Sequence, residues 1–289
     1  MPDERQTKND RRDAARELAR VTREKQKRQD RLRRWLIPTG VTVVVLAIVA
    51  IVVLVVSTSA PAPQTAKGPK NMISDGILFT GSGGKMVATP TAAIKAKGTP
   101  TATTYNASDG VAHIVTYVDF TCPICQEFEQ TNEAALQQMV ESGAATLEVH
   151  PITILDSHFT GARYSSRAAN VAACVANYDP DSFYAVMGGM YDGQATEGGP
   201  GLSNAQMISI VHKAGLRDAD VDKCINGESF KAWVTSSTAR ALAGPLPNTS
   251  VSAVTGTPTV LVNGQQFTPT TSYTDATQLP AFIQQVMAG

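Results

Sequence analysis

The sequence predicts a mixed α/β domain that carries a helical insertion and follows one transmembrane helix. Three observations support this fold class. An apolar, β-branched run ends just before Cys122 and Cys125, and a run with helical spacing follows them. Helical patterns then fill most of residues 157–244, between two groups of strand-like segments. An apolar span at residues 35–56 precedes all of these elements, and a hydrocarbon core needs about 20 such residues.

The N-terminal segment, residues 1–34, is rich in charge and almost free of large apolar side chains. Lys and Arg outnumber Asp and Glu here, although the whole chain has 25 of each class. A basic arm of this kind is also found in proteins that bind nucleic acid. Arg31, Arg33 and Arg34, however, stand directly before the apolar span. The positive-inside rule therefore predicts a cytoplasmic N-terminus, and we expect no nucleic-acid partner.

The apolar span has the composition of a membrane anchor. Residues 41–56 include one polar side chain, that of Thr42, and Trp35 suits the membrane interface. A cleaved signal peptide is the alternative, with residues 57–60 as a cleavage site. The basic leader is long for a signal peptide and the apolar run exceeds a usual signal core, which favours an uncleaved signal anchor. We expect a single-pass protein of the cell membrane.

Four regions follow from these patterns. Residues 57–72 are rich in Pro, Ala, Ser and Thr without a helical or strand period, which is typical of a partly extended linker. The predicted organisation is a basic cytoplasmic segment (1–34), a transmembrane signal anchor (35–56), a linker (57–72) and an extracytoplasmic domain (73–289) with its helical insertion at about 157–244.

Within the domain, each element is predicted from its local period and its flanking turns. The predicted strands are 76–80, 85–88, 111–119, 145–154, 259–262 and 265–267. The predicted helices are 126–140, 162–178, 182–191, 204–214, 218–225, 229–243 and 275–287. The glycines at 81–84 and the Asn263-Gly264 pair predict the turns of two hairpins.

The cysteine pair at the strand-to-helix junction has the pattern of a redox site. The first turn of a helix has unpaired N–H groups and a partial positive charge, which would stabilise a Cys122 thiolate. Cys122 is therefore the predicted attacking sulfur. Pro123 fits the first helical position. Cys125 lies three residues on, deeper on the same helix face, and is the predicted resolving thiol.

A Cys-x-x-Cys pair also forms half of many zinc sites. The sequence offers His113, His150, His158 and His212, but none has the spacing of a zinc finger relative to the cysteines. The strand before the pair and the helix after it favour redox chemistry, so we expect no resident metal and no cofactor. A membrane-tethered metal carrier that uses the two thiolates stays open as a non-enzymatic alternative.

Two motifs resemble the DsbA-like thioredoxin-fold oxidoreductases of bacteria, of an actinobacterial type. The first is Asp119-Phe-Thr-Cys-Pro-Ile-Cys125 with Phe128-Glu129, and the second is Thr255-Gly-Thr-Pro-Thr-Val-Leu-Val-Asn-Gly264. The resemblance covers roughly residues 74–289 and implies a thioredoxin fold with a helical insertion. It also implies that Thr257-Pro258 is a cis peptide beside the cysteines, so that Thr257 and Pro258 support the active site.

The resemblance implies a thiol–disulfide oxidoreductase that forms disulfides in secreted or cell-surface proteins and passes electrons to a membrane partner, often a quinone-linked one. The chain departs from the pattern at two positions. Ile124 stands where such oxidants often have histidine, which removes a donor to the thiolate, and Thr257 is the residue found in periplasmic isomerases. Both departures indicate a weaker oxidant, so a reductase or isomerase is the alternative enzyme.

Other titratable residues are assigned simpler roles. The domain contains Cys174 and Cys224 in addition to the reactive pair, and an oxidising compartment favours a structural disulfide between them, with two separate buried thiols as the alternative. His113 is assigned to strand packing. Asp119 and Glu129 flank the cysteines; either would serve as a buried proton carrier, but exposed charge is the simpler interpretation.

Overall fold

The computed structural model describes residues 66–106 and 108–288. Its centre is a six-stranded sheet with the order β2-β1-β4-β3-β5-β6. The strands are β1 (Ile77–Ser82), β2 (Lys85–Ala88), β3 (Ala112–Val118), β4 (Ala145–Pro151), β5 (Thr259–Val262) and β6 (Gln265–Phe267). β3 and β4 are parallel, and every other neighbouring pair is antiparallel. The two predicted hairpins, β1–β2 and β5–β6, are confirmed.

The two faces of β3 carry different side chains because successive residues of a strand point to opposite sides. Ala112, Ile114 and Val118 belong to the main hydrophobic core. Tyr117 belongs to a second, smaller core with Leu261 on β5. The sheet is therefore buried on both faces in its centre, which is why this stretch of sequence is almost continuously apolar.

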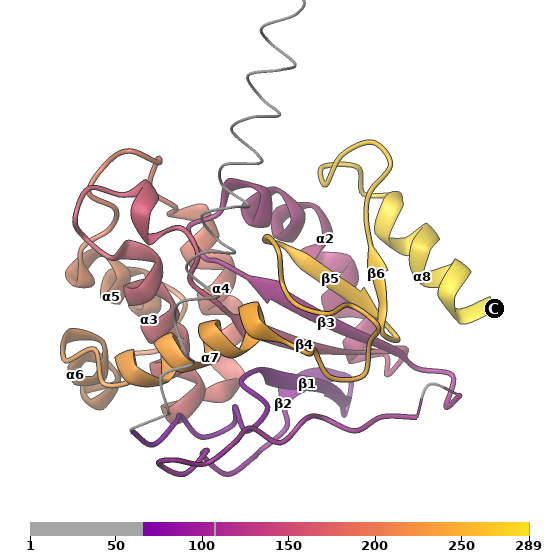
Figure 1. The fold of residues 1–289 in the computed structure, drawn as a ribbon, viewed down its shortest axis with the longest axis horizontal. Coiled ribbons are helices and arrows are strands. Elements are labelled where there is room, and N and C mark those ends of the chain that lie inside the picture. Colours follow the sequence, from indigo (N-terminus) through magenta and orange to yellow (C-terminus); the bar gives the residue numbers. More distant parts are fainter. Residues whose placement is uncertain (1–65, 107, 289) are drawn as a thin grey trace, which may run out of the picture. The chain divides into compact units, whose positions relative to one another are not determined.

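Helix α2 (Pro123–Glu141) packs against β1, β2 and β4 on the side of the main core. An all-helical segment connects β4 to β5, and it consists of α3 (Tyr164–Tyr178), α4 (Phe183–Asp192), α5 (Asn204–Lys213), α6 (Ala219–Asn226) and α7 (Lys231–Ala243). Figure 1 shows α3, α4, α5 and α6 gathered beside the sheet, and α8 (Gln278–Ala288) at the other edge next to β6. The predicted helical insertion is thus present, and in the sequence it lies between strands β4 and β5.

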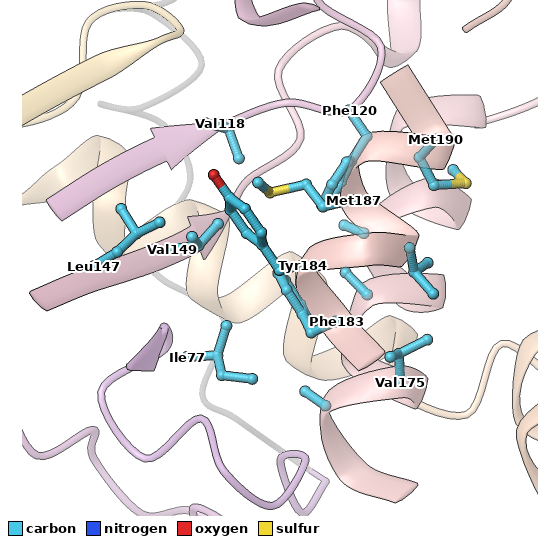
Figure 2. Packing of buried hydrophobic residues seen from close by; sticks show 14 of the residues in the cluster. Ile77, Val118, Phe120, Leu147, Val149, Val175, Phe183, Tyr184, Met187 and Met190 are labelled. Carbon is cyan, nitrogen blue, oxygen red and sulfur yellow. The ribbon is translucent and has the colours of Figure 1, made fainter. Parts of the chain in front are cut away.

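The insertion shares the main core with the sheet. Figure 2 shows strand side chains of Val118, Leu147 and Val149 facing Tyr184 and Met187 of α4. Phe79 of β1 also contacts α4, because its ring centroid lies 5.9 Å from that of Phe183. Helix α4 is therefore fixed against the sheet close to the end of β3.

Several boundaries differ from the sequence prediction by one to three residues; α2, for example, begins at Pro123 instead of residue 126. Three other differences have a clear cause. Strand β4 ends at Pro151 instead of residue 154, because the amides of Ile154 and Leu155 bind the carboxylate of Asp119. Helix α8 begins at Gln278, after a turn in which Asp275 accepts a hydrogen bond from the Thr277 amide. The domain also begins before residue 73, because Met72, assigned to the linker, is fully buried in the core.

The remaining predictions about the N-terminal part concern residues outside the described ones. The basic segment 1–34 and the signal anchor 35–56 both lie there. Among residues 66–106 and 108–288, no helix combines the length and the apolar character that a membrane span requires.

Candidate active site

The predicted redox pair lies where β3 leads into α2. Cys122 is the N-cap residue of α2 with an extended backbone, and Pro123 occupies the first turn. Proline suits this position because its φ is already helical and its missing N–H would have no partner there. Pro123 therefore begins the helix directly after Cys122 and directs the first-turn N–H groups towards the sulfur.

The two sulfurs are unequal. Both cysteines are free thiols; Cys122 is 7 % exposed and Cys125 is fully buried. Hydrogen bonding from the Cys125 thiol lowers the pKa of Cys122 to about 6. The Thr257 side chain and the amides of Cys125 and Ile124 contribute further, against the effect of burial. Burial raises the pKa of Cys125 well above its usual range. The arrangement provides one reactive thiolate and one protonated partner.

The second motif lies beside the first. The Cys122 thiol donates a hydrogen bond to the Thr257 carbonyl over 3.4 Å, although the two residues are far apart in the sequence. The peptide bond between Thr257 and Pro258 is cis. Ile124 is 41 % exposed, which places an apolar side chain on the surface next to the pair. The structure therefore brings Cys122, Pro123, Ile124, Cys125 and the Thr257-Pro258 segment together.

Asp119 is buried, so the expectation that it carries an exposed charge is wrong. Its carboxylate accepts hydrogen bonds from Thr121, from the Ile154 and Leu155 amides and from the Ser165 hydroxyl, at 2.6–3.2 Å. Burial raises the pKa of Asp119, while these hydrogen bonds oppose the change. The carboxylate thus joins the loop before α2, the segment after β4 and the start of α3.

Glu129 is also buried, again in contrast to the sequence interpretation. It is 3 % exposed, and neither carboxylate oxygen has a hydrogen-bond partner among residues 66–106 and 108–288. Burial and the nearby charge of Glu133 raise the pKa of Glu129 to about 8. The helical period contained a signal for this position, because Glu129 lies four residues after Cys125 and therefore on the same buried face of α2.

Gln194 is a site residue that the sequence does not indicate. Its side-chain amide donates to the carbonyls of Phe120 and Cys122, over 2.9 Å and 3.1 Å. Gln194 follows α4 and belongs to the helical insertion. No local pattern could have revealed this contact, because it depends on how the insertion folds back onto the strand-to-helix junction.

The other two cysteines form a disulfide. Cys174 of α3 and Cys224 of α6 are joined, with their Cα atoms 5.9 Å apart. Both residues are almost completely buried in the main core. The bond connects two helices of the insertion and does not include either sulfur of the redox pair.

The histidines do not gather around the cysteines. His113 stacks on Tyr105, with ring centroids 4.2 Å apart, and contacts Thr146 and Asp109, in agreement with a packing role. In the part of the chain that the structure describes, no group of three or more His, Cys, Asp or Glu side chains could hold a metal ion.

The thiolate should have a clear pH signature. We expect alkylation of Cys122 in the reduced protein to rise with pH through about pH 6. The pKa is lower in the folded state than the usual value of 9.0. Between these values the unfolded state binds more protons at Cys122, so the reduced form gains stability relative to the oxidised form as the pH rises from about 6 to about 9. This gain is lost as the pH falls through about 6.

The control is the oxidised protein, in which neither Cys122 nor Cys125 can titrate. Chemical denaturation at several pH values measures both forms. Equal pH dependence of the reduced and oxidised forms between about pH 6 and pH 9 would contradict a stabilised thiolate.

Comparisons with known proteins agree with this geometry. The thioredoxin family model matches residues 98–280. Reduced DsbA from Mycobacterium tuberculosis is 28% identical, covers 74% of this chain and 93% of its own, and has a TM-score of 0.54. The oxidised form of that protein is 26% identical with the same coverage and a TM-score of 0.52. No curated protein matches the chain.

A more distant structure shows the same fold. BdbD from Bacillus subtilis is 14% identical, covers 78% of this chain and 99% of its own, and has a TM-score of 0.51. The family match spans more than half of the chain and includes both cysteines and the cis-proline segment. The chain therefore belongs to the thioredoxin family and is a DsbA-like protein disulfide oxidoreductase.

Proposed function

We propose that the chain forms disulfides in secreted or cell-surface proteins through Cys122 and Cys125. The observation that carries the proposal is the inequality of the two sulfurs. Cys122 is 7 % exposed with a pKa lowered to about 6, whereas Cys125 is fully buried with a raised pKa. A stabilised Cys122 thiolate favours the reduced form of the pair, which gives the disulfide form oxidising power.

The proposed reaction has two exchanges. A substrate thiolate attacks Cys122 Sγ of the oxidised pair, and the Cys122–Cys125 bond breaks as the mixed disulfide forms. Cys125 leaves as a thiolate and takes up a proton, in accordance with its raised pKa. A second substrate thiolate then attacks the substrate sulfur and displaces Cys122. The substrate gains one disulfide, and its two electrons reside on the Cys122–Cys125 dithiol.

The low pKa of Cys122 assists the second exchange, because a thiol of lower pKa leaves faster. Thr257 and Pro258 lie beside this sulfur, and we assign them the support of the substrate backbone by family resemblance. Ile124 adds an exposed apolar contact next to the site. Its side chain has no donor for the thiolate, which favours a weaker oxidant and keeps a reductase or isomerase as the second candidate.

We place this activity outside the cytoplasm, on a domain tethered to the cell membrane by residues 35–56. The support is the order of a basic segment, an apolar span and a linker before the catalytic domain. A membrane partner, quinone-linked in the pattern of the family, would accept the two electrons and restore the disulfide. Such a partner is needed because each substrate leaves the pair reduced.

The test is catalysed oxidative refolding. The full chain in oxidised form is mixed with a reduced, unfolded protein that needs disulfides, in the presence of a metal chelator. We expect recovery of the substrate's own activity to be faster than with glutathione alone. No acceleration, together with stoichiometric copper or zinc binding that requires Cys122, would favour the metal carrier and contradict the proposal.

A further inference from the structure

We propose that Gln194 is a positioning residue for the redox pair: its amide holds the carbonyls of Phe120 and Cys122 and thereby stabilises the thiolate at Cys122. The inference deepens the proposed function and rests on it only in taking Cys122 as the reacting sulfur. Gln194 does not touch the sulfur in this structure. It acts through the backbone on either side of Thr121.

The carbonyls concerned lie at a break between two regular elements. The pairing of β3 ends at Val118 with Pro151 and at Tyr117 with Thr259, so the Phe120 carbonyl lies beyond the sheet. The Cys122 carbonyl begins α2 by accepting a bond from the Gln126 amide at 3.1 Å. Both oxygens carry partial negative charge close to the site of the thiolate, where it would raise the free energy of the anion.

One side-chain amide donates to both oxygens. The Nε2 atom of Gln194 lies 2.9 Å from the Phe120 oxygen and 3.1 Å from the Cys122 oxygen. Its hydrogens offset part of the negative charge of each carbonyl, and they also fix the orientation of the two peptide groups. The thiolate gains from both effects, because the positive ends of the first-turn amides stay directed at it.

Gln194 itself is held in place by the insertion. Its backbone amide donates to the Tyr191 carbonyl over 3.1 Å at the end of α4. The same carbonyl accepts a bond from the side chain of Gln126 on α2. The Tyr191 ring also packs on Phe120, with centroids 5.5 Å apart. The end of α4 and the start of α2 thus form one connected unit, so the insertion sets the geometry of the redox pair.

The test uses two variants that remove the donors and keep the size of the side chain. Gln194→Met has no hydrogen-bond donor, and Gln194→Glu places an acceptor against the two carbonyls. Gln130→Met is the matched control, because Gln130 also links α2 to the end of α4, at Asp192, over 3.1 Å. Its bond is exposed and does not involve the backbone before α2.

The readouts are the thiolate pKa of the reduced full chain, from ultraviolet absorbance against pH, and the equilibrium with glutathione. We expect Gln194→Met to raise the thiolate pKa by roughly half to one unit. The equilibrium constant for reduction of the Cys122–Cys125 disulfide by glutathione should fall roughly three- to tenfold. Gln194→Glu should have the larger effect. Gln130→Met should leave both quantities unchanged.

An unchanged thiolate pKa in both Gln194 variants would overturn the proposal. Gln194 is half-buried in a loop, so we expect both variants to fold, and thermal melting verifies this. A lower melting temperature with an unchanged thiolate pKa would also overturn the proposal, because it would mean that Gln194 stabilises the fold without affecting the thiolate. If the chain proves to be a reductase and not an oxidase, this test of Gln194 still holds, because each variant is compared with the original chain.

Discussion

Replacement of Cys122 by alanine is expected to reduce the catalysed refolding rate to the background rate. Cys122 is the sulfur with the lowered pKa and the one that a substrate can reach, because Cys125 is fully buried. Without it neither the pair's disulfide nor the mixed disulfide can form. We expect this to be the largest effect of any single substitution on activity. The measurement is the recovery of a reduced substrate protein with the full chain.

A second variant separates chemistry from folding. Met287 on α8 is 36% exposed, so Met287→Ala should keep full refolding activity and serves as the matched control. Below about pH 6, where the Cys122 thiol is protonated, Cys122→Ala should melt close to the temperature of the reduced original protein, since only a small side chain is removed. Full oxidase activity in folded Cys122→Ala would show that Cys122 is not the attacking sulfur.

Removal of the Cys174–Cys224 disulfide is expected to have the largest effect on stability. Cys174 and Cys224 are 50 residues apart in the sequence. For a loop of that length, the entropy that the disulfide removes from the unfolded chain corresponds to about 4 kcal/mol of stability. For a domain of this size that loss corresponds to a melting temperature lower by roughly 10 °C. The double variant Cys174→Ser/Cys224→Ser avoids a single leftover thiol that could pair wrongly with Cys122.

The same variant should leave the redox pair almost unaffected. The disulfide joins α3 to α6, whereas the insertion reaches the pair through Gln194 after α4, and β3, α2 and the segment at Thr257 hold the sulfurs. We therefore expect an unchanged equilibrium with glutathione in the folded variant. An unchanged melting temperature would contradict a stabilising role, and an altered equilibrium would show that the two sites are coupled.

The parts of the fold that the sequence could predict are those with strong local signals. The apolar run before Cys122 and the helical period after Cys125 predicted β3 and α2. Asn263 and Gly264 predicted the β5–β6 turn, where both residues have positive φ. The count of cysteines suggested the bond between Cys174 and Cys224 that the structure contains.

The parts that the sequence could not predict depend on contacts between distant segments. Besides its neighbour Thr121, the buried Asp119 receives donors from Ile154, Leu155 and Ser165, in segments that follow β4. The end of β4 at Pro151 follows from the same contacts. Gln194 reaches the site because α4 packs against α2. Glu129 could have been identified from its helical position, because it shares the buried face of α2 with Cys125 and Phe128.

The direction of the reaction is the central claim, and the chemistry of Cys122 bears on it. Its pKa of about 6 lies between the value of about 3.5 in the strong oxidant DsbA and about 7 in thioredoxin. The exposed side chain of Ile124 offers no donor to the thiolate, which agrees with an intermediate stabilisation. We therefore expect an oxidant weaker than the strongest members of the family.

The reduction potential of the Cys122–Cys125 pair tests this claim most directly. The full chain is equilibrated with glutathione buffers of known ratio, and the fraction of reduced pair is measured by thiol labelling. Disulfide donors and isomerases cover about −120 to −180 mV, and we predict a value in this range, closer to its lower end of about −180 mV. A value near about −270 mV, like that of thioredoxin, would contradict disulfide donation and assign the chain to the reductases.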